Sequence, residues 1–124
     1  MKRGEVTRIV VADDEEDMRV LVRSVINRAN HGLMVESEVE NGLDAVEKWR
    51  ETRPDVMLLD QRMPGLTGLE AAEQILAEHP GQIIVLFSAF LSDVIRAAAE
   101  AIGVRACVSK ENIFSLPETL WSTA

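Results

Sequence analysis

The stretch DVMLLDQRMPGLTGLE, residues 55–70, decides the fold of this chain. Its apolar run, residues 56–59, is typical of a strand that is buried on both faces. Asp60 ends that run, and a turn-forming Met-Pro-Gly segment follows it. The Thr-x-x-Glu spacing at residues 67–70 has the pattern of a capping box, which predicts that a helix begins there. The stretch therefore predicts a carboxylate at the carboxyl end of a buried parallel strand, where open α/β sheets build their sites.

The rest of the chain repeats this pattern of a strand followed by a helix. Apolar or alternating runs predict five strands, at about residues 8–12, 34–39, 56–60, 83–87 and 105–109. Each is followed by a segment with helical periodicity or helix caps, and the last of these helices is short. Alternation of this kind implies a parallel sheet with helices on both faces, joined by right-handed crossovers. We expect an α/β, doubly wound five-stranded sheet that forms one domain over residues 1–124.

Local signals place several boundaries within this pattern. Polar and apolar residues alternate along residues 34–39, which predicts a strand with one more exposed face at an edge of the sheet. Asn30-His31-Gly32 is expected to end the first helix. A second Ser-x-x-Glu capping box, residues 115–118, is expected to begin the last one.

Composition excludes several classes of protein. The net charge of −8 opposes direct binding to nucleic acid, because phosphate recognition needs clusters of Lys and Arg. Cys107 is the single cysteine, which excludes an intramolecular disulfide and suits a reducing cytoplasm. No stretch approaches the roughly 20 apolar residues that a membrane helix needs. We therefore expect a soluble, cytoplasmic protein that contacts neither nucleic acid nor a membrane.

Side chains suited to chemistry follow four of the predicted strands. Asp13 and Asp14 follow the first strand, Asp60 the third, Ser88 the fourth and Lys110 the fifth. Parallel strands all point the same way, so these side chains are expected to meet at one rim of the sheet. Crowded carboxylates are costly unless a cation neutralises them, and a site with oxygen ligands alone suits Mg²⁺. A carboxylate can also attack phosphorus, with Mg²⁺ and a lysine balancing the charge of the transferred group.

Each of these residues also has a simpler interpretation. The acidic run at residues 13–17 favours the positive end of a helix, Asp60 can cap a turn, and Ser88 and Lys110 are of types common on surfaces. Independent accidents rarely place all of them on one rim, so their joint placement favours a functional site.

The ordered pattern of these residues resembles the receiver domain of two-component response regulators. The motifs are Asp13-Asp14, then Asp60-x-x-Met63-Pro64-Gly65, then Ser88-Ala89 and finally Lys110, and together they cover nearly the whole chain. The resemblance implies a flavodoxin-like sheet with strand order 2-1-3-4-5. It also implies a signalling domain that is not an enzyme, beyond assisting its own phosphorylation and dephosphorylation. Its partners would be a sensor histidine kinase and a downstream output domain or partner protein.

The resemblance assigns a role to each site residue. Asp60 would accept the phosphoryl group in a Mg²⁺-dependent reaction, Ser88 would turn toward that group, and Lys110 would pair with it. The implied metal ligands are Asp13, Asp14, Asp60 and the backbone carbonyl of Arg62. Asp14 would bind the ion directly, whereas Asp13 would act mainly through water.

The chain departs from the family pattern near this site. Cys107 stands where the family has a switch aromatic residue, and Glu111 replaces the usual proline, so the peptide before it is expected to be trans. Arg62 and Phe90, which lie two residues beyond Asp60 and Ser88, are both large. We interpret them as a shield that keeps water from an acyl phosphate.

Two alternative functions remain at this point. A degenerate receiver that binds partners without phosphorylation is compatible with Cys107 and Glu111. A Mg²⁺-dependent phosphatase with Asp60 as its nucleophile is disfavoured, because such enzymes usually carry a second Asp where this chain has Arg62.

Overall fold

The computed structural model describes residues 6–29 and 32–124. Strands and helices alternate in it, with a 3₁₀ segment before the last helix: β1 (Thr7–Ala12), α1 (Glu16–Ala29), β2 (Leu33–Val39), α2 (Gly42–Thr52), β3 (Val56–Leu59), α3 (Gly68–Glu78), β4 (Ile83–Ser88), α4 (Asp93–Ile102), β5 (Ala106–Ser109), η1 (Lys110–Ser115) and α5 (Leu116–Thr123). Each strand differs from its expected range by one residue at one end. The expected helix-ending residues Asn30 and His31 lie outside the described residues, and α1 ends at Ala29.

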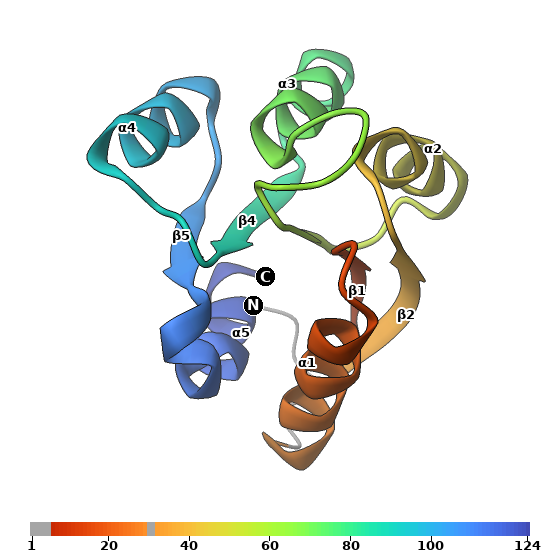
Figure 1. The fold of residues 1–124 in the computed structure, drawn as a ribbon. Helices are drawn as coiled ribbons and strands as arrows, with labels where there is room; N and C mark the ends of the chain where they lie inside the picture. The colour runs from red at the N-terminus through yellow and green to blue at the C-terminus, as the bar shows by residue number, and fades with distance from the viewer. Residues whose placement is uncertain (1–5, 30–31) are drawn as a thin grey trace.

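The five strands form one sheet in the order β2-β1-β3-β4-β5, and every neighbouring pair is parallel. This confirms the doubly wound architecture, the expected strand order and the edge position of β2. Helices α1 and α5 cover one face of the sheet, and α2, α3 and α4 cover the other (Figure 1).

Alternate residues of the strands supply the two halves of the core. On β3, Val56 and Leu58 pack toward α1 and α5, whereas Met57 and Leu59 pack toward α2 and α3. All four are buried, because a central parallel strand is covered on both faces. None of the helices in the described part of the chain has the length and apolar character needed to span a lipid bilayer.

Helix caps agree with the sequence at α3 but not at α5. Thr67 Oγ1 accepts from the Glu70 N–H at 3.2 Å, and Glu70 Oε1 accepts from the Thr67 N–H at 2.9 Å, so the first capping box is confirmed. The second is wrong, because Ser115 is already helical and its side chain caps nothing. Its hydroxyl donates instead to the Asn112 carbonyl at 2.7 Å. The chain enters α5 from η1 without a break, so no free N-terminal turn needs a cap.

The start of α3 packs directly against the end of β3. A Cβ atom at Gly68 would collide with the backbone carbonyl of Asp60, so only glycine permits this approach. The Gly68 N–H also donates to the Gln61 carbonyl at 3.0 Å. The Leu69 N–H donates to the Gln61 side chain at 2.9 Å. These contacts hold the backbone of Asp60 in one place.

Candidate functional site

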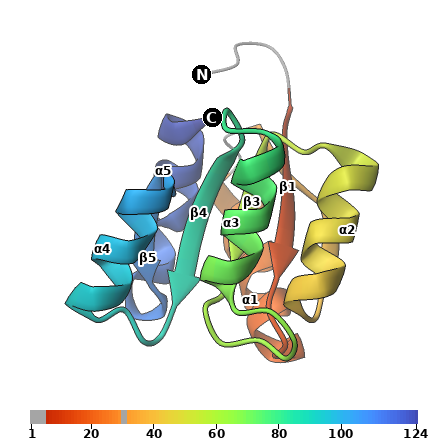
Figure 2. The same cartoon turned by 90° about the horizontal axis from the view of Figure 1, so that it is seen from above.

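The loops that follow the strands gather at one end of the sheet. Figure 2 shows β1 and β4 running in the same direction, with the loops after their arrowheads at the same end of the molecule. Asp13, Asp60 and Ser88 lie there and are 2%, 5% and 1% exposed. The Asp13 N–H donates to Val39 at 3.1 Å, and the Asp60 N–H donates to Ala12 at 3.0 Å. These backbone bonds continue the sheet by one residue and fix both carboxylates at its rim.

Lys110 joins the two buried carboxylates. Its Nζ atom lies 2.8 Å from Asp13 Oδ2 and 3.0 Å from Asp60 Oδ2. Glu15 Oε1 is 3.7 Å from the same nitrogen. Lys110 begins η1 directly after β5, and its side chain is 9% exposed. A buried ammonium with this many acceptors is held in one position.

Burial and charge shift the pKa values of this pair. Burial raises the pKa of the Asp60 carboxyl, and the neighbouring Asp13 charge adds to the effect; the hydrogen bond from Lys110 lowers it without cancelling the rise. Burial opposes the charge of Lys110, but hydrogen bonds to Asp13 and Asp60 outweigh it, so the pKa of Lys110 also rises. The lysine is therefore charged at neutral pH, and the ionised form of Asp60 lowers the stability of the fold.

Three acidic side chains converge beside this pair. Carboxylate oxygens of Asp13, Asp14 and Glu15 lie within 4.8 Å of one another. Asp13 is buried, whereas Asp14 and Glu15 are exposed. The Glu15 N–H also donates to Asp13 Oδ1 at 2.9 Å. This donor set contains only carboxylate oxygens, which fits a hard divalent cation such as Mg²⁺.

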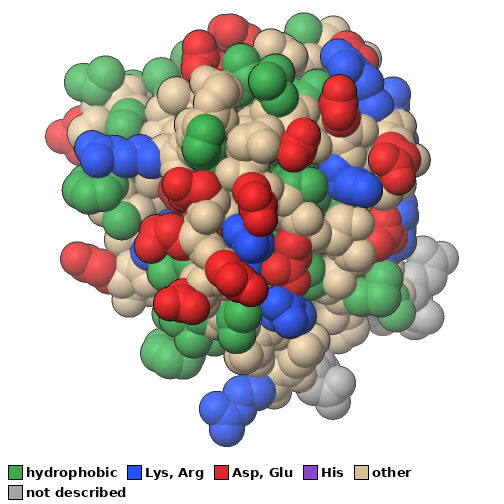
Figure 3. Space-filling view, turned by 45° about the vertical axis from the view of Figure 1, so that its right-hand side comes forward, with side chains coloured by type: hydrophobic (Ala, Val, Ile, Leu, Met, Phe, Trp, Pro, Cys, Tyr) green, Lys and Arg blue, Asp and Glu red, His purple; other side chains and the backbone are tan. Residues whose placement is uncertain are grey.

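One face of the molecule carries many charged side chains. On the face shown in Figure 3, acidic side chains gather near the centre with Lys and Arg side chains among them. Hydrophobic side chains lie mainly toward the periphery of this view. The face suits a small charged ligand better than an apolar one.

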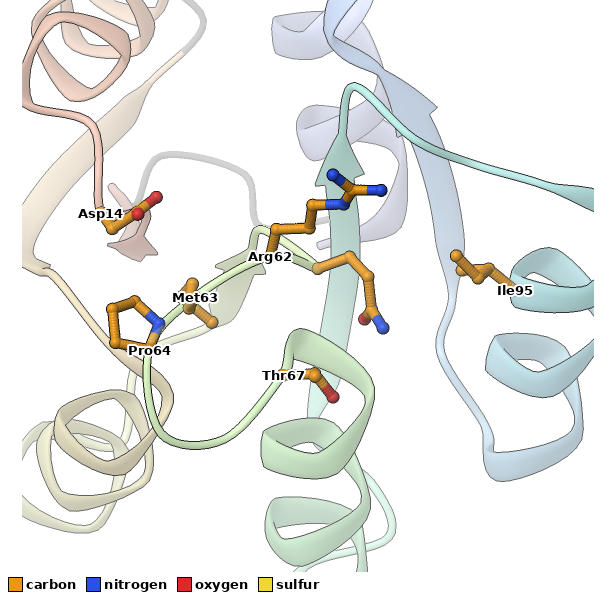
Figure 4. Close-up of a pocket in the computed structure, with 7 residues that line it drawn as sticks. Asp14, Arg62, Met63, Pro64, Thr67 and Ile95 are labelled. Carbon is orange, nitrogen blue, oxygen red and sulfur yellow. The ribbon is translucent and has the colours of Figure 1, made fainter.

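Asp60 opens onto a shallow pocket. The pocket has a volume of about 180 Å³ and is lined by Asp14, Glu15, Asp60, Arg62, Ser88, Ala89, Phe90 and Lys110. The Arg62 guanidinium lies over the Phe90 ring, 3.8 Å from its centroid, and Phe90 is 54% exposed. Figure 4 shows the neighbouring pocket, in which the Arg62 side chain points away from Asp14. Arg62 and Phe90 thus form one side of the approach to Asp60.

The other two departures from the family pattern are Cys107, which lies on β5, and Glu111, which lies on η1. Cys107 is half-buried against the core formed with α2, α3 and α4, and burial raises the pKa of its thiol. A thiol of this kind is a poor nucleophile. The described residues contain no cis peptide bond, so the peptide before Glu111 is trans, as expected.

The structure brings together most of the residues selected from the sequence. Asp13, Asp60 and Lys110 are in contact, while Ser88 lines the pocket with Asp14 and accepts from the Phe90 N–H at 3.4 Å. The Arg62 carbonyl remains a predicted ligand.

Two residues near the site were missed. Glu15 belongs to an acidic run whose sequence favours a helix start, and nothing in the sequence indicates that it lies 3.7 Å from Lys110. Arg19 hydrogen-bonds the Asp13 backbone, and the sequence offers no signal for it beyond its place on α1.

Family models and curated relatives agree on one family. The model described as response regulator receiver domain matches residues 9–118. The chemotaxis protein CheY of Listeria monocytogenes is 37% identical over 82 residues, which cover 66% of this chain and 67% of that protein.

Solved structures show the same similarity. The response regulator domain of Thermotoga maritima CheB has a TM-score of 0.88 at 27% identity, with 96% of both chains covered. A DNA-binding response regulator of the LuxR family from Staphylococcus aureus has a TM-score of 0.87 at 31% identity, covering 95% of this chain and 98% of that one.

Proposed function

This chain belongs to the response regulator receiver domain family, and on that premise we propose that it is a phosphoacceptor signalling domain of a two-component system. Asp60 takes a phosphoryl group from a sensor histidine kinase. The observation that carries this proposal is the Asp60 carboxylate, fixed at a strand end, held by Lys110 at 3.0 Å and open to a pocket. The state of Asp60 controls a downstream output domain or partner protein.

The side chains at the rim suit the steps of phosphoryl transfer. A carboxylate oxygen of Asp60 forms the new bond to phosphorus as the bond to the donor breaks. Lys110 is the fixed cation beside that oxygen, so it pairs with the transferred group, and the Ser88 hydroxyl donates to one of its oxygens. Residues 1–124 act as one cytoplasmic domain without an enzymatic activity toward other substrates.

A Mg²⁺ site completes the proposal. Asp13, Asp14, Asp60 and the backbone carbonyl of Arg62 would hold the ion. The closeness of the Asp13 and Asp14 carboxylate oxygens supports the first two of these ligands. Bound Mg²⁺ supplies positive charge to offset the negative charge of the transferred group. Asp13 keeps its backbone N–H and one carboxylate oxygen in fixed hydrogen bonds, so the loop is shaped before an ion arrives.

Intact mass spectrometry tests the proposed function. Incubation with acetyl phosphate and Mg²⁺ is expected to add one phosphoryl group, and addition of EDTA before the reagent is expected to prevent the gain. A folded protein that neither gains mass nor binds Mg²⁺ would contradict the proposal. That result would favour a receiver that acts as an interaction module without phosphorylation.

Phe90→Ala is expected to shorten the lifetime of the acyl phosphate. The Phe90 ring supports the Arg62 guanidinium at the entrance to the Asp60 pocket, and its loss admits water to the phosphoryl group. We expect a decay about two- to fivefold faster, which corresponds to a hydrolysis barrier lowered by about 0.5–1 kcal/mol. The measurement is intact mass over time after removal of acetyl phosphate.

A second exposed phenylalanine provides the control. Phe114 lies on η1 and is 83% exposed, and it does not line the Asp60 pocket. Phe114→Ala is expected to decay at the wild-type rate. Decay of the Phe90→Ala phosphate that is unchanged or slower would contradict the shielding role.

A further inference from the structure

Arg19 connects the acidic loop after β1 to the edge strand β2. Its Nη1 atom donates to the Asp13 carbonyl oxygen at 2.6 Å. Its Nε and Nη2 atoms lie 3.5 and 3.6 Å from carboxylate oxygens of Glu38 and Glu40. The side chain is only 11% exposed. A guanidinium that is covered and held on three sides has one preferred orientation, so it acts as a rigid brace.

The contact to Asp13 completes a set of restraints on that residue. The Asp13 N–H donates to Val39 at 3.1 Å, one carboxylate oxygen accepts from the Glu15 N–H at 2.9 Å, and the other lies 2.8 Å from Lys110. The carbonyl is the remaining polar group, and Arg19 is its donor. This carbonyl belongs to the peptide that leads into Asp14, so its direction sets where the chain turns.

Charge and position make opposite predictions for Arg19. A fixed positive charge beside a cation site repels the cation, so removal of Arg19 would strengthen cation binding if charge alone mattered. Glu38 and Glu40 offset that charge at 3.5 and 3.6 Å. If Arg19 instead positions the loop, its removal weakens cation binding, because the ligands lose their arrangement. The direction of the change therefore separates the two effects.

We propose that Arg19 is a positioning residue for the divalent-cation site. It fixes the Asp13 carbonyl and thereby holds the carboxylates of Asp13, Asp14 and Glu15 within 4.8 Å of one another. The inference rests on the proposed function, because that function requires Mg²⁺ at this acidic loop. The residues that shape the site then include Arg19 on α1 and the carboxylates of Glu38 and Glu40, which hold its guanidinium.

Mg²⁺ titration by calorimetry tests the proposal, with the 124-residue chain as wild type and as three variants. Arg19→Met is expected to raise the Kd for Mg²⁺ about tenfold, as loss of a residue that orients metal ligands does. Arg19→Lys is expected to give an intermediate Kd, because an ammonium can reach the carbonyl but cannot hold both glutamates as well.

Arg23→Met is the matched control. Arg23 lies one turn further along α1, pairs with the same Glu38 at 2.7 Å and is 46% exposed. In the described part of the chain it makes no hydrogen bond to Asp13, so its loss removes the same charge and one partner of Glu38 without touching the loop. Its Kd for Mg²⁺ is expected to equal that of the wild type or to lie below it.

A kinetic readout separates positioning from general damage to the fold. The rate of phosphorylation by acetyl phosphate is expected to fall in Arg19→Met at limiting Mg²⁺ and to recover at saturating Mg²⁺. A rate that stays low at saturating Mg²⁺ would indicate a purely structural role and overturn the inference. If Arg19→Met does not fold, Arg19→Lys decides: a Kd above wild type supports the inference, and an equal or lower Kd overturns it.

Failure of the proposed function gives a different pattern. If the wild type binds no Mg²⁺, the proposed metal site and this inference fail together. If the wild type binds Mg²⁺ and Arg19→Met binds it equally or more tightly, only the inference about Arg19 fails.

Discussion

Asp60→Asn is expected to gain no mass from acetyl phosphate and Mg²⁺ under conditions in which the wild type gains one phosphoryl group. The side-chain amide has nearly the shape of the carboxylate but lacks the anionic oxygen that attacks phosphorus. Asp60 is buried and in contact with Lys110, so a mass gain that is absent in this variant assigns the modification to one residue. A variant that still gains a phosphoryl group would place the acceptor elsewhere.

The same substitution is expected to stabilise the fold at neutral pH in metal-free buffer. Burial raises the pKa of Asp60, so the folded state favours its protonated form and the ionised form costs stability. That cost is fully present above the raised pKa. It disappears as the pH falls through the raised pKa toward the ordinary value of about 3.9. The amide of the Asp60→Asn variant never carries the charge, so the advantage of the variant should shrink over the same pH range.

Urea unfolding of both proteins measures this difference. We expect a higher midpoint for Asp60→Asn at pH 7 and nearly equal midpoints at about pH 4. An advantage that is constant across the range, or larger at low pH, would contradict the assignment of the cost to Asp60. Both unfolding measurements need EDTA, because a bound divalent cation would stabilise the ionised Asp60 of the wild type.

Lys110→Ala is expected to destabilise the metal-free protein by about 3 kcal/mol or more at pH 7. Lys110 lies 2.8 and 3.0 Å from Asp13 and Asp60, whose side chains are only 3% and 5% exposed. Its removal leaves two buried carboxylates facing each other without a counter-charge. Mg²⁺ is expected to restore part of the lost stability, because a cation bound to either carboxylate reduces their repulsion.

An exposed lysine provides the control for charge removal alone. Lys48 pairs with Glu51 at 3.5 Å on α2, where the two side chains are 30% and 68% exposed. Lys48→Ala is expected to cost about 0.5 kcal/mol or less. In a double variant, Asp60→Asn should reduce the cost of Lys110→Ala, because only one buried charge then remains unpaired. Equal losses of unfolding free energy in Lys48→Ala and Lys110→Ala would contradict the interpretation that Lys110 neutralises two buried carboxylates.

The sequence by itself determined the α/β architecture and the edge of the sheet at which the site residues gather. Alternating strands and helices require a parallel sheet, and parallel strands bring their carboxyl ends to one edge whatever the details of packing. The positions of Asp13, Asp60 and Lys110 directly after predicted strands were therefore enough to predict that all three lie at one edge of the sheet. The capping box at Thr67 and Glu70 was equally readable, because both partners lie within one helical turn.

A local sequence pattern gave a wrong prediction where the preceding segment of the chain decides the conformation. The Ser-x-x-Glu pattern at residues 115–118 predicted a free helix start, but η1 already leads the chain into α5 and Ser115 has no cap to make. A capping motif describes a helix that begins from extended chain, and the sequence alone does not give the path of the preceding residues.

Only the tertiary structure decided which side chains act on one another within the rim. Lys110 contacts Asp60 across 50 residues of chain, Arg62 lies over Phe90, and Arg19 reaches the Asp13 carbonyl. Such contacts depend on how each crossover connection packs against the sheet and on which side-chain rotamers that packing permits. Neither property leaves a periodic pattern in the sequence from which it could be predicted. The sequence therefore determined the edge at which the charges gather, whereas the packing of the loops and helices around that edge decided which charge meets which.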